Sequence, residues 1–169
     1  MKQDFDNNVD SLITKYSQLV FAIAMTHTQN RSDADDVFQN VFLAYFQKSV
    51  HFNDEEHQKA WFIKTTLNHA KKITNSFWRK RTSELDENVA GTTITFATIE
   101  QELLFEALSS LSDKYRIVIH LFYLEELSIR EIASVLNRSE SAIKTQLSRG
   151  RVMLKELLKG DFDDEQESI

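Results

Sequence analysis

The side chains best suited to binding chemistry form a polar and basic set near the C-terminal end of the chain. At about 100° per residue, Ile143, Leu147, Gly150 and Leu154 share one face of a helix, and the polar set lies opposite. Arg and Lys can donate hydrogen bonds to guanine, and Ser and Thr can contact bases or phosphates. The pattern predicts a helix that packs on its own domain and reads a DNA groove. The polar set is Ser141, Lys144, Thr145, Ser148 and Arg149.

The residues before this helix predict a helix-turn-helix. Ser128 and Glu131 have the spacing of a capping box, and an apolar helix follows to Leu136. Asn137 tolerates the left-handed backbone expected at the turn, and Ser139 can cap the final helix, which runs to about residue 159. In this motif the start of the second helix points at base edges in the major groove. The flanking side chains Arg138, Ser139, Arg151 and Lys155 suit contacts to DNA. The alternative is an ordinary helical hairpin with a solvated polar side.

A second basic region lies in the first half of the chain. The net charge is −6, but residues 57–83 contain no acid and seven Lys or Arg. Residues 138–159 hold six basic groups against two acids. Two basic regions in an acidic chain indicate two surfaces for nucleic acid, although solvated helix faces remain the alternative for each. The first region contains Lys59, Lys64, Lys71, Lys72, Arg79, Lys80 and Arg81.

Catalytic and metal sites are not indicated. No His-Glu-x-x-His spacing, Gly-rich phosphate loop or nucleophile constellation occurs in the sequence. We therefore expect no catalytic activity, no metal and no cofactor. The remaining candidates are predicted to be surface or loop residues: His27, His51, His57 and His69.

The composition predicts an all-α protein. The chain of 169 residues has no proline, three glycines and 41% hydrophobic residues, too few turn formers for a β-sandwich. The absence of cysteine suits a reducing cytoplasm. No signal region opens the chain and no run of 18 apolar residues occurs, so we expect a soluble, intracellular protein without membrane insertion.

Helical periodicity is interrupted once, which predicts two small helical domains joined by a flexible linker. Helices are expected at about 6–28, from a Ser32 cap to 48, and from a capped start at 53–56 to 81. Residues 82–98 have no helical period, although Thr92–Phe96 could form a strand. Helices resume near Ile99, with Ser112 capping the next one. The expected layout is a first domain at 1–81, the linker at 82–98, the helix-turn-helix domain at 99–160 and a disordered acidic tail at 161–169.

Two blocks of sequence together resemble the extracytoplasmic-function sigma factors, a compact group of bacterial sigma factors. Asp33–Phe46 is similar to the region 2 helix that holds core RNA polymerase, and Ala60–Lys71 is similar to the promoter-melting segment. Ala107–Leu111 with Arg116, then Glu131–Ala133, then Ile143–Arg151, resemble region 4. The resemblance covers about 25–81 and 103–158, which is most of the chain. The order and spacing of the motifs make it specific.

The resemblance implies a role for each block. Asp36, Gln39 and Phe42 match positions that bind core polymerase. The helix expected at 32–48 carries more large apolar residues than one buried stripe needs, and a polymerase contact would explain this surplus. The polar set of the last helix matches the reader of the minus-35 element, and a family partner, an anti-sigma factor, is implied. A loop at 51–59 matches the rim of a pocket for a flipped base. The positions matched near the minus-10 element are Lys64, Asn68, Lys71 and Lys72.

The sequence departs from the family pattern at three places. Ser112 stands where a proline is usual, and Asn137 stands where a turn glycine is common. The pocket loop carries three consecutive acids, Asp54–Glu56, beside the expected DNA.

The resulting hypothesis is a sigma factor that binds core polymerase, places two DNA-reading surfaces on one promoter and helps to melt it. A stand-alone helix-turn-helix regulator is the main alternative, and it predicts tight operator binding without polymerase. A polymerase-binding adaptor is the other alternative, and it predicts core binding without promoter dependence.

Overall fold

The computed structural model of the chain describes the backbone of residues 2–81 and 99–166, and the side chains of residues 9–76 and 103–160. Within these ranges every regular element is a helix, so the predicted all-α class is confirmed. The chain forms two compact units that divide after Gly91. The expected linker at 82–98, with its possible strand, lies outside the described residues. None of the described helices combines the length and the apolar character needed to cross a membrane.

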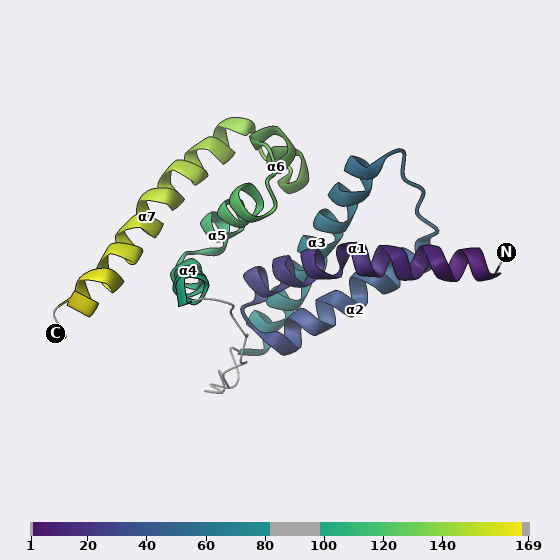
Figure 1. Cartoon of the computed structure of the whole chain (residues 1–169), viewed down its shortest axis with the longest axis horizontal. Helices are drawn as coiled ribbons and strands as arrows, with labels where there is room; N and C mark the ends of the chain where they lie inside the picture. The colour runs from purple at the N-terminus through teal and green to yellow at the C-terminus, as the bar shows by residue number, and fades with distance from the viewer. Residues whose placement is uncertain (1, 82–98, 167–169) are drawn as a thin grey trace. The chain divides into compact units, whose positions relative to one another are not determined.

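Unit 1 is a bundle of three helices, each of which contacts the other two (Figure 1). They are α1 (Lys2–Thr28), α2 (Arg31–Lys48) and α3 (Glu55–Arg81). Helix α1 begins four residues before its predicted start. The ring of Tyr16 stacks on Phe62 with centroids 4.4 Å apart, and its hydroxyl donates to Gln58 Oε1 at 2.9 Å. Large side chains that are almost completely buried form the core of the unit: Val20, Ile23, Val37, Val41, Phe62 and Ile63.

Helix starts in unit 1 are set by side-chain caps. The prediction that Ser32 caps α2 is wrong, because Asn30 has the extended backbone of a cap (φ −139°, ψ 128°). Its Oδ1 accepts the Asp33 N–H at 3.0 Å, which places Ser32 inside the first turn. The predicted capped start of α3 is confirmed, since Asp54 Oδ1 accepts the His57 N–H at 2.7 Å.

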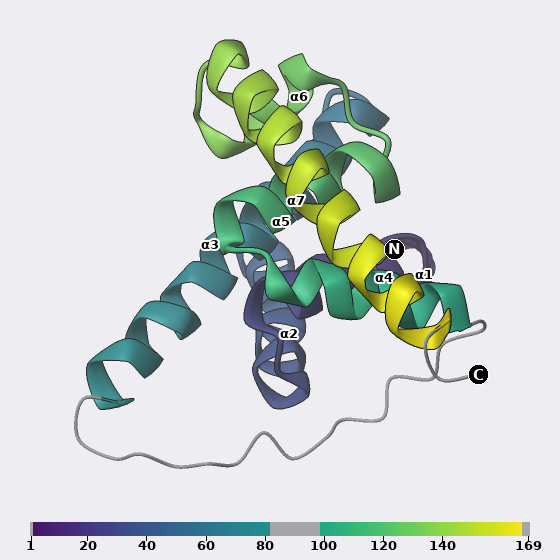
Figure 2. The same ribbon diagram turned by 90° about the vertical axis from the view of Figure 1, so that its left-hand side faces the viewer.

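Unit 2 is built along one long helix. Its elements are α4 (Ile99–Ser110), α5 (Asp113–Ile119), the π-helical turn η1 (His120–Leu124), α6 (Ile129–Leu136) and α7 (Glu140–Gln166). Figures 1 and 2 show α7 running beside α5, with α6 near its N-terminal part and α4 near its C-terminal part. Gly150 permits this approach, since a Cβ there would lie 2.7 Å from Ile119 Cδ1. Fully or nearly fully buried side chains form the core: Val118, Leu121, Ile132, Ile143 and Leu147.

The end of α7 and both ends of α5 differ from the sequence predictions. Helix α7 continues to Gln166, so the first six residues of the predicted disordered tail are helical. Gly160 does not adopt the positive φ that would end a helix there. Ser112 occupies the cap position of α5 without a side-chain capping bond. The π-helical turn buries His120, whose Nε2 lies 3.1 Å from Glu125 Oε1, and periodicity gave no sign of it.

Candidate nucleic-acid interfaces

The turn between α6 and α7 fixes where the recognition helix begins. The predicted capping box is present, with the Ser128 N–H donating to Glu131 Oε2 at 2.7 Å and the Glu131 N–H donating to Ser128 Oγ at 3.2 Å. Asn137 has the predicted left-handed backbone (φ 52°, ψ 51°). The Arg138 N–H returns to Ala133 O at 2.9 Å, which ends α6 in a Schellman motif. Both ends of α6 are therefore closed by hydrogen bonds, and this determines the direction of the chain entering α7.

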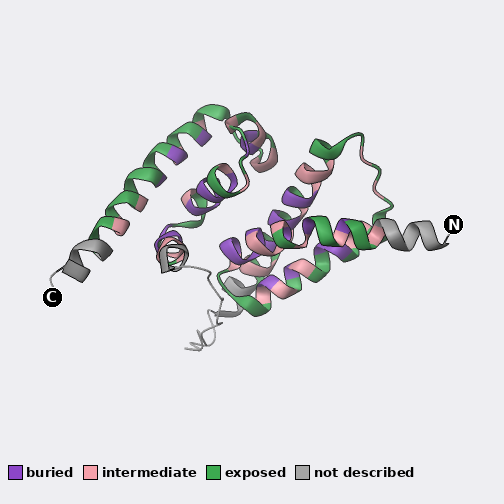
Figure 3. Cartoon of the chain, in the orientation of Figure 1, coloured by how far each residue is buried: buried purple, intermediate pink, exposed green. Residues whose placement is uncertain are grey.

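The exposed side of α7 presents the predicted polar set. Ile143 and Leu147 on its other side are almost completely buried, and Figure 3 shows this division along the helix. Because the buried side is held by the core, the exposed side keeps a fixed orientation, as entry into a DNA groove requires. The exposed members are Ser141, Lys144, Thr145, Ser148 and Arg149.

Some predicted contact residues also serve the local fold. Ser139 Oγ accepts the Ala142 N–H at 3.1 Å, which confirms it as the cap of α7. Arg138 donates from Nη1 to Gln146 Oε1 at 2.9 Å. Thr145 Oγ1 donates to the Ser141 carbonyl at 3.0 Å, so its methyl group and both lone pairs of Oγ1 remain available to a ligand. These residues are exposed, yet part of their hydrogen-bonding capacity is already used.

Helix α3 presents a second polar face in unit 1. Phe62, Ile63 and Thr66 are completely buried on the opposite side. Because residues 57–76 contain no acid, the exposed cations have no carboxylate neighbour on their own helix. Such a face can follow a phosphate backbone. Its exposed residues are Lys64, Asn68, Lys71 and Lys72.

Aromatic rings gather beside the start of α3. Phe52, in the loop before the helix, stacks with Tyr45 (centroids 6.2 Å apart, rings 6° apart) and meets Trp61 edge-on at 5.8 Å. The His57 ring meets Phe52 edge-on at 5.6 Å. Trp61 is half-buried, so it is neither a completely buried core residue nor a free stacking platform. Rings in this setting can stack on unpaired bases.

The three acids of this loop have different surroundings. Asp54 caps α3, and Glu55 forms an ion pair with Lys15 of α1 at 2.8 Å. The hydrogen bond from Lys15 is the main reason that the pKa of Glu55 is lowered. Glu56 is exposed. Two of the three carboxylates therefore serve the fold of unit 1, which explains how an acidic loop can lie beside an expected DNA surface.

The exposed face of α2 differs from the one expected for a partner. Asp36 and Gln39 are exposed as predicted, but Phe42 is buried and its ring lies 5.6 Å from that of Phe62. A ring held in the core cannot contact a partner without repacking. The exposed apolar residues on this helix are Leu43 and Phe46, at 51% and 40% of their full exposure. They carry the surplus of apolar side chains that the sequence showed.

The four candidate histidines differ in how far they are buried. His51 and His57 are exposed, as predicted, and His69 is half-buried on α3. The prediction that His27 is a surface or loop residue is wrong, because it is buried and its Nδ1 lies 3.4 Å from Thr74 Oγ1 of α3. Among the side chains that the structure describes, no group of three or more potential ligands is close enough to hold a metal ion.

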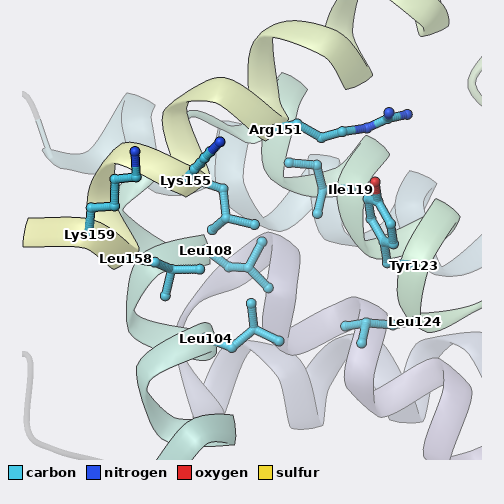
Figure 4. A pocket seen from close by; sticks show the side chains of 10 residues that line it. Leu104, Leu108, Ile119, Tyr123, Leu124, Arg151, Lys155, Leu158 and Lys159 are labelled. Carbon is cyan, nitrogen blue, oxygen red and sulfur yellow. The ribbon is translucent and has the colours of Figure 1, made fainter. Parts of the chain in front are cut away.

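An apolar groove of about 570 Å³ runs along the C-terminal half of α7 (Figure 4). Leu104 and Leu108 of α4 form its floor, and Leu124 of η1 closes one end. The guanidinium of Arg151 lies 5.6 Å and 5.7 Å from the ring centroids of Phe122 and Tyr123. This contact holds Arg151 at the groove, and the cations that line it are Arg151, Lys155 and Lys159.

Both units match known families. Residues 12–84 match the family described as sigma-70 region 2, and residues 101–154 match the family described as sigma-70, region 4. The two matches cover the exposed faces of α2, α3 and α7 described above.

Full-length relatives resemble the chain over almost its whole length. The ECF RNA polymerase sigma factor SigM of Bacillus subtilis is 28% identical, and the match covers 93% of this chain and 99% of SigM. The ECF RNA polymerase sigma factor SigW of the same organism is also 28% identical, with 94% and 92% covered.

Solved structures share the fold. The sigma factor RpoE of Bartonella quintana, in complex with the anti-sigma factor NepR, matches with a TM-score of 0.74 and 23% identity over 93% of this chain and 98% of that chain. CnrH, in complex with the cytosolic domain of CnrY, matches with a TM-score of 0.67 and 22% identity over 92% and 90%.

Proposed function

Because this chain belongs to the sigma-70 family, as a sigma factor of the extracytoplasmic-function group, we propose that it directs core RNA polymerase to specific promoters and helps to melt them. It acts in the cytoplasm and has no catalytic activity of its own. In this proposal residues 1–81 form region 2, 82–98 a linker, 99–160 region 4 and 161–169 an acidic tail.

One observation carries the proposal: each unit presents an exposed polar helix face that is backed by a rigid core. The face of α7 belongs to a helix-turn-helix with both ends of α6 capped, so it suits the major groove of the minus-35 element. The acid-free face of α3 lies on the unit that holds the aromatic cluster, so it suits the minus-10 element and its melting.

Core polymerase binds the exposed face of α2. At helical spacing Asp36, Gln39, Leu43 and Phe46 share this face, and all four are exposed. Asp36 and Gln39 make one end of this face polar, and Leu43 and Phe46 make the other end apolar. Surfaces that bind other proteins commonly combine apolar and polar areas in this way. Phe42 supports this face from beneath, in place of the direct contact expected from the resemblance.

An anti-sigma factor is the second protein partner. Two similar structures, RpoE and CnrH, were solved with NepR and CnrY respectively. The groove beside α7 offers unit 2 an apolar floor with a rim of Arg151, Lys155 and Lys159. Because the groove is apolar and its rim is positive, it fits an amphipathic helix that carries acidic side chains.

The acidic balance of the chain supports action within polymerase. With a net charge of −6, the free chain has only weak electrostatic attraction to DNA in general. Two modest DNA sites gain affinity through effective concentration once polymerase fixes their spacing. The free protein therefore avoids unproductive binding across the genome.

Run-off transcription with purified core polymerase and a promoter library tests the proposal. We expect transcripts from a subset of promoters that share two elements, only when the chain is present. A DNA-binding regulator without sigma activity would bind an operator but would give no transcript. An adaptor would bind core polymerase without promoter selection, and either result would contradict the proposal.

A further inference from the structure

A second group of donors lies at the edge of the recognition helix. Lys114 and Tyr115 belong to the first turn of α5, and the Lys114 ammonium lies 4.8 Å from the centroid of the Tyr115 ring. Gly150 brings α7 close to this turn, since a Cβ at Gly150 would lie 3.4 Å from Tyr115 Cβ. Arg149, the residue before Gly150, therefore lies at the edge of α7 that is nearest to α5.

The pKa of Tyr115 agrees with this arrangement. The pKa of the Tyr115 phenol is lowered, mainly because Lys114 donates a hydrogen bond toward it, while partial burial acts in the opposite direction. Arg149 lowers the same pKa through a further hydrogen bond and its charge. With Lys114 over the Tyr115 ring and Gly150 packed against Tyr115 Cβ, each of the two helices places a cation beside this side chain.

The fold does not neutralise these cations. Lys114 and Arg149 are both exposed, and no ion pair to either is found within the described part of the chain. The nearest acid on α5, Asp113, is engaged by the buried Arg116. Two unpaired cations held close together repel one another, so an anion bound between them would relieve that repulsion.

We infer that Lys114, Tyr115 and Arg149 form a clamp for a DNA backbone phosphate beside the minus-35 element, an inference that rests on the proposed function. A guanidinium, an ammonium and a phenol supply the charged and neutral donors that phosphate oxygens accept. Arg149 is thereby assigned to the backbone rather than to a base edge.

The clamp leaves base reading to the rest of the α7 face. Lys144 lies about 140° around the helix from Arg149, so the two cannot serve the same contact. Lys144, Ser141 and Thr145 then face the groove. On the other side, Glu156 lines a hollow of about 650 Å³ together with Tyr115, further along α7. Its carboxylate repels phosphate, so the DNA backbone should lie on the side of Tyr115 that faces Lys114 and Arg149, away from this hollow.

Salt dependence of DNA binding by the full chain tests the clamp. Affinity is measured against KCl concentration for a selected promoter duplex and for a duplex of unrelated sequence. We expect Lys114→Ala and Arg149→Ala each to lower the slope of log affinity against log salt by about 1, and to weaken both duplexes by the same factor. Tyr115→Phe should weaken both duplexes with no change in slope.

Arg31→Ala is the control, because Arg31 is an exposed cation of unit 1 that pairs with Asp35 and lies outside both proposed DNA faces. It should leave the slope unchanged, and thermal unfolding should show that every variant is folded. An unchanged slope for Lys114→Ala would overturn the clamp, as would a loss for Arg149→Ala confined to one base pair. Failure of the run-off transcription test would instead count against the proposed function, while the unrelated duplex would still decide the clamp.

Discussion

Units 1 and 2 each expose one polar helix face, but the side chains on the two faces differ in kind. The face of α7 carries short hydroxyl side chains with a cation at each edge, Lys144 and Arg149. The face of α3 carries long cations and an amide, on the unit that also holds the aromatic cluster of Tyr45, Phe52 and Trp61. Short side chains on a rigid helix suit the reading of base edges in a closed duplex. Long cations and nearby rings suit a strand whose bases have been unstacked.

The two faces also depend on different supports. Helix α7 is positioned by backbone geometry, namely the capping box at Ser128 and the left-handed turn at Asn137. Helix α3 is positioned by side-chain contacts, with Phe62 packed against Tyr16 and Phe42. Changes that remove one kind of support should therefore damage one unit and spare the other.

The largest effect is expected from the core of unit 1. Phe62→Ala removes a fully buried ring, and it should lower the free energy of unfolding of that unit by about 3–5 kcal/mol. Hydrogen exchange should show faster exchange in α1 to α3 with unchanged protection in α5 to α7. Leu147→Ala is the matched change in unit 2, with the reverse pattern. Loss of protection in both units from either change would contradict their separate support.

A smaller effect is expected at the turn of unit 2. Asn137→Ala places a residue that disfavours left-handed backbone at φ 52°, and it should cost about 1–2 kcal/mol of stability. Asn137→Gly removes the same side chain but accepts this backbone, so its cost should be near zero or negative. Chemical denaturation followed by circular dichroism measures both. Equal losses for the two variants would show that the Asn137 side chain, and not its backbone, supports the turn.

Charge removal on α3 should separate the two faces functionally. Lys71→Ala removes one exposed cation, and it should slow formation of open promoter complexes by about fivefold, because one lost phosphate contact is worth about 1 kcal/mol. The initial closed complex, which depends on α7, should form with little change. Permanganate reactivity of unpaired thymines reports opening. Arg31→Ala, which removes an exposed cation of α2 outside this face, is the control and should leave the rate of opening unchanged.

The smallest effect concerns His69. Partial burial is the main reason that the pKa of His69 is lowered, and the charges of Lys72 and Lys48 act in the same direction. A histidine whose folded pKa is lowered contributes stability above its ordinary pKa of about 6.5, and that stability is lost as the pH falls through the folded value. Urea unfolding of unit 1 at pH 8 and pH 5.5 should show a loss at the lower pH. His69→Gln should reduce that loss, and an equal loss in the variant would remove His69 from this explanation.

The sequence predicted local features better than side-chain burial. The capping box, the left-handed Asn137 and the Ser139 cap depend on neighbours within a few residues, and all three are confirmed. Phe42 and Phe46 are only four residues apart on α2, and the pattern could not tell which of them faces the core. That choice depends on how α1 and α3 pack against α2.

Other differences arise from long-range contacts or from competing local signals. His27 is buried because α3 packs beside the end of α1. The contact residue on α3, Thr74, lies forty-seven positions further along the chain. Asn30 and Ser32 both belong to residue types that cap helices well. Asn30 is the one with extended backbone, and its side chain accepts the Asp33 N–H. Helical periodicity was sufficient to place the polar residues of α3 and of α7 on exposed faces. The convergence of Arg149 with Lys114 and Tyr115 required the close approach that Gly150 permits.

We propose that unit 2 reads the minus-35 element while unit 1 opens the promoter. The most direct measurement compares Lys144→Ala with the double variant Lys64→Ala and Lys71→Ala, each bound to core polymerase, on one promoter identified by run-off transcription. Closed-complex affinity and the rate of opening are measured separately. We predict that Lys144→Ala loses affinity only when the minus-35 element is intact, and that the double variant loses opening on promoters with or without that element. Loss of opening from Lys144→Ala at saturating DNA, or loss of minus-35 dependence from the double variant, would contradict this division.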